Sequence, residues 1–112
     1  MEIKNIGFIG LGAMGSVMAP LIVKAGYNVI GYDINSKIDK STGVNQVDSI
    51  QGLNGMDIII FMLPNSKIVK QVTNQLLDIN IKSILIDMSS SDPRDTKQLG
   101  KFLESKYINL LD

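Results

Sequence analysis

Residues 6–15 read IGFIGLGAMG, an apolar run followed by three glycines in the spacing G-x-G-x-x-G. A second apolar run, over residues 27–32, is followed at once by the acidic residue Asp33. This order of strand, glycine turn, helix, strand and acid is typical of a dinucleotide site. The pattern therefore predicts a nucleotide cradle at the start of a parallel α/β sheet.

The three glycines of this pattern have separate expected roles. Gly10 permits the tight turn off the strand, Gly12 lets the backbone approach a pyrophosphate, and Gly15 lets the helix pack closely on the sheet. The carboxylate of Asp33 is expected to accept hydrogen bonds from an adenosine ribose. The alternative is a glycine-rich turn followed by a solvated aspartate. The apolar strand before the turn, the amphipathic stretch after it and the spacing of the acid argue against that alternative.

The composition excludes several classes of protein. Eleven basic and eleven acidic residues cancel among the 112, so the chain has no basic footprint for nucleic acid. Its apolar runs are far too short to cross a bilayer, so no membrane partner is expected. The chain has no cysteine and no secretory signal at its start, which suits a cytoplasmic protein.

The chain also contains no histidine. A hydroxyacid dehydrogenase of the lactate or malate kind needs an imidazole to move the alcohol proton, and this chain cannot supply one. A zinc alcohol dehydrogenase needs histidine and cysteine ligands, so that class is excluded too. No metal site is expected.

Apolar periodicity and turn residues predict alternating strands and helices. The expected strands cover residues 4–9, 28–32, 45–47, 57–63, 83–88 and 107–111, the expected helices 13–25, 65–77 and 92–105, with a turn at 41–43 and a helical turn at 49–53. Such alternation predicts a Rossmann-type doubly wound parallel sheet with helices on both faces, formed as a single domain over residues 1–112. Its ligand crevice would lie beyond the carboxyl ends of the strands.

Two later loops have chemistry that suits the same crevice. Residues 62–66, MLPNS, end the central strand with an apolar pair and a proline, which could form a wall beside a flat ring. Residues 87–93, DMSSSDP, offer hydroxyls where a nicotinamide ribose or carboxamide would sit. Helix capping and turn formation explain Ser91 and Asp92 equally well. Asp87 is interpreted as a strand-end acid that binds loop amides, not as a catalyst.

The segments 6–19, 61–66 and 85–93 together resemble the 3-hydroxyisobutyrate dehydrogenase family, a group of β-hydroxyacid dehydrogenases related to 6-phosphogluconate dehydrogenase and the imine reductases. The resemblance covers essentially the whole chain and implies a Rossmann domain that binds a nicotinamide dinucleotide. The cofactor-binding residues that it implies are Gly10, Leu11, Gly12, Ala13, Met14 and Gly15 at the pyrophosphate loop, Asp33 and Ile34 at the adenosine ribose, Met62, Leu63 and Pro64 along the cofactor, and Ser90 near the nicotinamide.

Asp33 also bears on the choice of cofactor. Its carboxylate would accept ribose hydroxyls but repel a 2′-phosphate, and family members that use NADP usually have Asn-Arg at residues 33 and 34. The nearest cation here is Lys37. NAD is therefore predicted, and NADP is disfavoured.

Family members continue beyond the part that this chain resembles. They carry a motif Asp-Ala-Pro-Val-Ser-Gly-Gly that helps to hold the substrate carboxylate, then a helical domain with the catalytic lysine and most dimer contacts. The chain stops at Asp112, the first residue of that motif. The resemblance thus implies a homo-oligomeric, NAD-dependent dehydrogenase of a small 3-hydroxy acid, of which these 112 residues bind the cofactor but contain no catalytic residue.

Two other functions are compatible with a glycine loop and a strand-end acid. One is a stand-alone nucleotide-sensing module, like the Rossmann domains that regulate potassium channels, although these usually have arginine where Ala13 stands here. The other is an S-adenosylmethionine methyltransferase, which usually shows a shorter glycine turn. Neither alternative accounts for the loops at 62–66 and 87–93.

Overall fold

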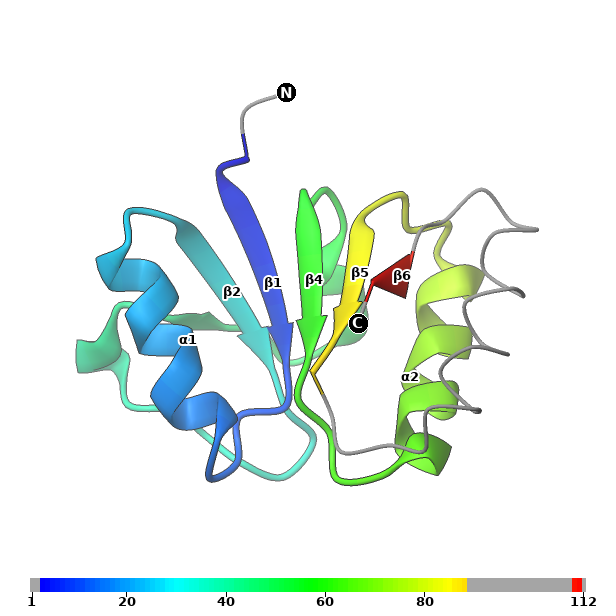
Figure 1. Ribbon diagram of the computed structural model, residues 1–112, viewed down its shortest axis with the longest axis horizontal. Helices are drawn as coiled ribbons and strands as arrows, with labels where there is room; N and C mark the ends of the chain where they lie inside the picture. The colour runs from blue at the N-terminus through cyan, green and yellow to red at the C-terminus, as the bar shows by residue number, and fades with distance from the viewer. Residues whose placement is uncertain (1–2, 89–109, 112) are drawn as a thin grey trace.

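A computed structural model describes residues 3–88 and 110–111 of the chain. The elements in chain order are β1 (Asn5–Ile9), α1 (Gly15–Lys24), β2 (Asn28–Tyr32), η1 (Lys40–Thr42), β3 (Asn45–Gln46), η2 (Ile50–Leu53), β4 (Ile58–Phe61), α2 (Ser66–Asp78), β5 (Ile84–Asp87) and β6 (Leu110–Leu111) (Figure 1). The predicted alternation is confirmed for these residues. The helix predicted over residues 92–105 lies outside them.

The strands of the described residues form one parallel sheet in the order β3-β2-β1-β4-β5-β6. The chain begins in the middle at β1, moves outward to β3, and then crosses to the other side of β1 to form β4. The reversal point of this doubly wound sheet therefore lies between β1 and β4. Register places Ile9 beside both Tyr32 and Phe61, so the carboxyl ends of these three strands are level.

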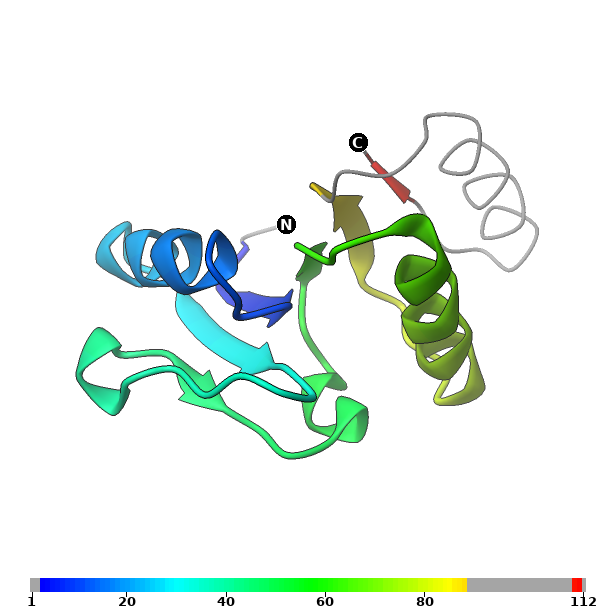
Figure 2. The same cartoon turned by 90° about the horizontal axis from the view of Figure 1, so that it is seen from below.

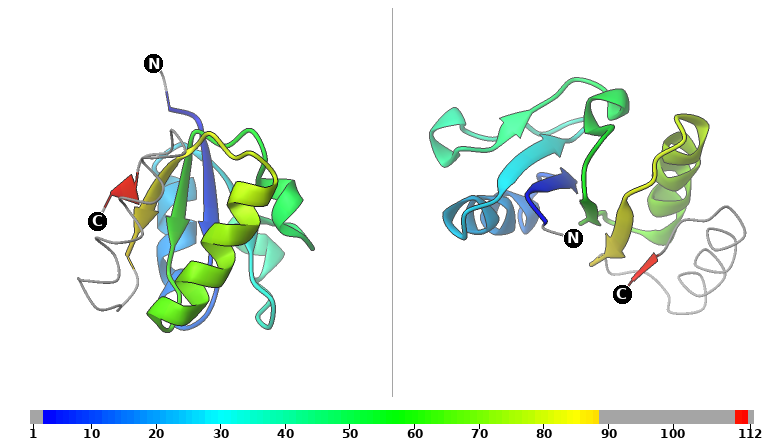
Figure 3. Two further views of the ribbon diagram at one scale, coloured as in Figure 1. Left: turned by 90° about the vertical axis from the view of Figure 1, so that its right-hand side faces the viewer. Right: turned by 90° about the horizontal axis from the view of Figure 1, so that it is seen from above.

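α1 and α2 cover opposite faces of the sheet, as the views from below and from above show (Figure 2 and Figure 3, right). Side chains alternate along β1, so Phe8 packs in the cluster that includes Ala19 of α1, whereas Ile9 packs with α2 residues such as Leu76. Phe8, Ala19 and Leu76 are fully buried. Each face of the sheet thus has its own apolar core, and the prediction of helices on both faces is confirmed.

Two element boundaries differ from the prediction by two residues, for reasons of local chemistry, and the other boundaries within the described residues differ by at most one. The strand predicted over residues 57–63 is longer than β4, because the chain turns into the loop before α2 just after Met62, whose N–H still donates to the carbonyl of Ile9 at 2.8 Å. The helix predicted from residue 13 begins at Gly15, because residues 12–14 form the turn that carries the glycine loop. The start of α2 agrees with the prediction, and the side chain of Asn65 caps it by accepting the N–H of Ile68 at 3.0 Å.

At the amino ends of the strands, a carboxylate connects β1 to the start of β4. Oδ2 of Asp57 accepts the N–H groups of Lys4 and Asn5, each at 2.9 Å. The N–H of Asn5 and then that of Lys4 hold the pKa of the Asp57 carboxyl below its usual range. The entry of β1 into the sheet is therefore fixed by a side chain from the neighbouring strand.

None of the helices within the described residues is both long enough and apolar enough to span a membrane.

Replacing Leu76 by alanine should lower the free energy of unfolding by about 2–5 kcal/mol, because it removes a fully buried side chain from the core under α2. Urea titration measures this loss. Asn74, exposed on the same helix, provides the control: Asn74→Ala should change the free energy by less than about 0.5 kcal/mol. Equal effects of the two substitutions would contradict the placement of α2.

Candidate functional site

A cleft of about 680 Å³ lies at the carboxyl ends of β1, β2 and β4. Its walls come from the glycine loop, the loop after β2, the loop after β4 and one side of α2. The lining residues are Ile9, Gly10, Gly12, Ala13, Met14, Gly15, Tyr32, Asp33, Ile34, Asn35, Ser36, Met62, Leu63, Pro64, Ile68, Gln71, Val72 and Gln75. The cleft is therefore at the reversal point of the sheet, where the sequence predicts a ligand.

The glycine loop is packed so tightly that two of its positions exclude a side chain. Gly10 has a φ of +102°, and a Cβ there would overlap the carbonyl oxygen of Met62. A Cβ on Gly15 would overlap the carbonyl oxygen of Gly10 and come within 3.1 Å of the Phe8 ring. The tight turn predicted at Gly10 and the close packing predicted at Gly15 are both confirmed.

The third glycine of the loop faces open space. No atom lies within 4 Å of the position that a Cβ on Gly12 would occupy, and Gly12 lines the cleft. The packing of the protein therefore does not require glycine at this position. The room beside its backbone is available to a ligand, as expected for close approach of a pyrophosphate.

The amino end of α1 opens onto the same cleft. Among the described residues, no side chain caps this helix and no acidic residue lies in its first turn. The first loop-to-helix bonds run from the N–H of Ser16 to the carbonyl of Gly12 at 2.9 Å and from the N–H of Met18 to that of Met14 at 3.0 Å. The positive end of the helix dipole is thus not neutralised by the protein, which favours an anionic group in the cleft.

Asp33 connects the loop after β2 to the glycine loop. Its Oδ2 accepts the N–H of Leu11 at 2.6 Å. Its Oδ1 accepts the N–H groups of Asn35 at 2.8 Å and Ser36 at 2.9 Å. Three backbone donors from two loops therefore hold one carboxylate, a structural role that the sequence analysis missed.

These contacts also keep Asp33 ionised. Burial by itself raises the pKa of the Asp33 carboxyl, but the N–H groups of Ser36, Asn35 and Leu11 stabilise the charged form more strongly. The pKa therefore lies below its ordinary value of 3.8. A carboxylate has about four acceptor positions, and the described backbone uses three of them. Oδ2 keeps capacity for a further hydroxyl donor.

The opposite wall of the cleft was only partly predicted. Met62, Leu63 and Pro64 line it, as expected from the loop after β4. The structure adds a row of α2 residues, Ile68, Gln71, Val72 and Gln75, and places Tyr32 at the end of β2 beside them. Their spacing of three and four residues was visible in the sequence, because positions so spaced follow one another along one side of a helix.

The predicted cofactor-binding residues come together around the cleft, apart from Leu11 and Ser90. Leu11 is 2 % exposed, and its side chain belongs to the core under α1, so only its backbone takes part, through Asp33. Ser90 lies outside the described residues. Asp87, at the end of β5, is 7 % exposed. Within residues 3–88 and 110–111, no group of three or more possible ligand side chains could hold a metal ion.

The Asp33 contacts predict a pH-dependent stability. Asp33→Asn should lower the free energy of unfolding by about 1–3 kcal/mol at neutral pH, because the amide cannot replace both carboxylate oxygens as acceptors. A lowered pKa means that folding favours the ionised form, so this contribution is complete above 3.8 and is lost as the pH falls through the folded-state pKa. Urea titrations should show a constant wild-type advantage down to about pH 5 that shrinks below pH 4. An advantage unchanged in acid would contradict this.

Comparison with known proteins agrees with the motifs. Residues 5–112 match the family described as the NAD binding domain of 6-phosphogluconate dehydrogenase. The chain is 34% identical to the mitochondrial 3-hydroxyisobutyrate dehydrogenase of Drosophila melanogaster, across 97% of its own length and 36% of that protein. It is 35% identical to 2-(hydroxymethyl)glutarate dehydrogenase of Eubacterium barkeri, across 96% of its length and 38% of that protein.

A solved structure shows the same arrangement. Mycobacterium tuberculosis 3-hydroxyisobutyrate dehydrogenase, determined with L-serine, superimposes with a TM-score of 0.89 at 26% identity, over 97% of this chain and 39% of that one. The chain thus spans little more than a third of the length of the relatives that it matches. It belongs to the family of NAD-binding domains of 6-phosphogluconate dehydrogenase, in which its relatives include the 3-hydroxyisobutyrate dehydrogenases.

Proposed function

We propose that the chain is the NAD-binding part of an oxidoreductase that transfers a hydride between NAD and a small 3-hydroxy acid. The observation that carries the proposal is the cleft itself. It combines an uncapped helix end, an open glycine position and an ionised carboxylate along one edge of the sheet. These are the groups that a pyrophosphate and an adjoining ribose need.

The residues of the chain would divide the cofactor between them. The backbone from Gly10 to Gly15 would hold the pyrophosphate, and Asp33 would accept a ribose hydroxyl beside Ile34. Met62, Leu63 and Pro64 would provide the apolar wall along the cofactor, and Ser90 would lie near the nicotinamide end. When bound, the cofactor supplies the hydride acceptor, and the protein supplies orientation and electrostatics.

The charge of the cleft favours NAD over NADP. Asp33 is ionised and lines the cleft, and we place a ribose beside it. Among the described residues, no lysine or arginine lines the cleft. A 2′-phosphate would therefore stand beside a negative charge with no cation to balance it.

The proposed substrate class is taken from the names of the curated relatives. Both 3-hydroxyisobutyrate and 2-(hydroxymethyl)glutarate carry a hydroxyl on the β-carbon relative to a carboxylate. Because the chain spans little more than a third of those proteins, we propose that substrate binding and proton transfer need residues beyond these 112. We further propose a cytoplasmic, homo-oligomeric parent protein with no nucleic-acid or membrane partner.

Titration of the protein with NADH and NADPH, followed by nicotinamide fluorescence, tests the proposal. NADH should bind at least about tenfold more tightly, which corresponds to about 1.4 kcal/mol of repulsion and lost hydrogen bonding at the 2′-phosphate. Binding of neither nucleotide would refute the function. Equal or tighter binding of NADPH would refute the role given to Asp33.

Gly12→Val should weaken NADH binding by at least about tenfold, because the added side chain would project into the space proposed for the pyrophosphate. The same variant should keep a melting temperature close to that of the wild type, since no atom beyond the adjoining residues lies within 4 Å of the added Cβ. Calorimetric titration and thermal unfolding measure the two quantities. Undiminished NADH affinity in a folded variant would place the pyrophosphate elsewhere.

A further inference from the structure

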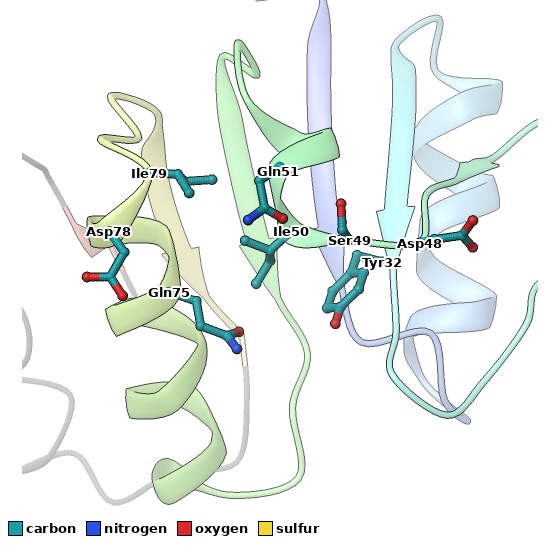
Figure 4. A pocket seen from close by; sticks show the side chains of 8 residues that line it. All are labelled: Tyr32, Asp48, Ser49, Ile50, Gln51, Gln75, Asp78 and Ile79. Atoms are coloured by element: carbon teal, nitrogen blue, oxygen red, sulfur yellow. The ribbon is translucent and has the colours of Figure 1, made fainter.

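A second, smaller pocket shares part of its lining with the cleft. This pocket has a volume of about 250 Å³ and lies between η2 and the later turns of α2 (Figure 4). Its lining residues are Tyr32, Asp48, Ser49, Ile50, Gln51, Gln75, Asp78 and Ile79. Tyr32 and Gln75 line both spaces, so they stand at the junction between them.

The proposed binding mode directs one part of the dinucleotide toward this junction. If the pyrophosphate lies at the glycine loop and a ribose at Asp33, the purine base must project from the far side of that ribose. The cleft residues in that direction are Tyr32, Ile34 and the α2 residues up to Gln75. The base would therefore lie between the loop after β2 and α2.

The walls of this space are suited to a neutral heteroaromatic ring. Ile34 is 83 % exposed and Val72 lines the facing wall, so both can contact the flat faces of a ring. No cation lines either space within the described residues, and the carboxylates of Asp48 and Asp78 point to the outer sides of the gap (Figure 4). Among the described residues, an anionic group would find no cation in either space to balance its charge.

Gln75 has the position and the chemistry to recognise the edge of the base. Its side chain points from α2 into the gap, as does the ring of Tyr32 from β2 (Figure 4). A glutamine amide offers a donor and an acceptor side by side, which matches the amino group and neighbouring ring nitrogen of adenine. Gln71, one turn earlier on α2, lines the larger cleft only.

We propose that Gln75 is a specificity-determining residue for the purine base of the dinucleotide, and that its amide forms hydrogen bonds with the edge of adenine at the junction with the smaller pocket. The proposal rests on the proposed function, because it takes the position of the base from the pyrophosphate and ribose contacts. It adds a hydrogen-bonding contact from α2 to the contacts proposed for the glycine loop and for Asp33.

Calorimetric titration with NAD⁺ and etheno-NAD⁺ tests this role. In etheno-NAD⁺, a two-carbon bridge joins the exocyclic amino nitrogen of adenine to the neighbouring ring nitrogen N1. This edge of the base therefore loses the amino donor and the N1 acceptor. Wild type should bind NAD⁺ about 3- to 10-fold more tightly than etheno-NAD⁺. Gln75→Leu should lose that preference, through weaker binding of NAD⁺ with unchanged binding of etheno-NAD⁺. Gln75→Met, a second replacement without an amide, should behave in the same way.

Asn74→Leu is the matched control, because Asn74 is an exposed amide on the same helix that lines neither space. It should keep the wild-type preference, and thermal unfolding should show all variants folded. If wild type binds NAD⁺ without preferring it, or if the Gln75 variants keep the preference, the role of Gln75 is refuted while the proposed function stands. If wild type binds neither nucleotide, the proposed function fails as well.

Discussion

The hydrogen bond from the N–H of Leu11 to Oδ2 of Asp33 joins two loops that are 22 residues apart in the chain. The buried side chain of Leu11 attaches the glycine loop to the core beneath it, and the N–H of the same residue attaches it to the loop after β2. The carboxylate of Asp33 therefore sets where the backbone of this loop lies relative to the end of β2. Every contact proposed for the pyrophosphate and the ribose depends on that spacing.

Backbone hydrogen bonds also hold the glycine loop in place at the carboxyl end of β1. The N–H of Gly10 donates to the carbonyl of Tyr32 at 3.0 Å, and the N–H of Met62 donates to the carbonyl of Ile9 at 2.8 Å. The hydrogen-bond ladder of the sheet therefore extends into the loops. At the amino end of β1, the carboxylate of Asp57 accepts the N–H groups of Lys4 and Asn5 and so fixes where the strand starts. Both ends of the central strand are thus held by carboxylates, and the glycine loop starts from a rigid base.

The sequence predicts the sheet well because buried parallel strands are continuous apolar runs, as in residues 58–61, and because the glycine spacing has few structural solutions. It predicts the wall formed by α2 poorly. Gln71 and Gln75 look like ordinary surface amides, and only the rotation of the helix about its axis, set by the burial of Val72 and Leu76, turns them toward the cleft. The inward packing of Leu11 likewise follows from the path of the turn, which local residue preferences do not specify.

The two N–H groups that bind Oδ1 of Asp33 have a consequence for the arrival of a ligand. Asn35 and Ser36 restrict the carboxylate to one orientation, while its second oxygen accepts the N–H of Leu11 and keeps capacity for one more donor. A flexible acceptor would give up rotamer freedom on each encounter, and that entropic cost would reduce affinity. Here the freedom is lost once, during folding, so the acceptor is preorganised before any nucleotide approaches.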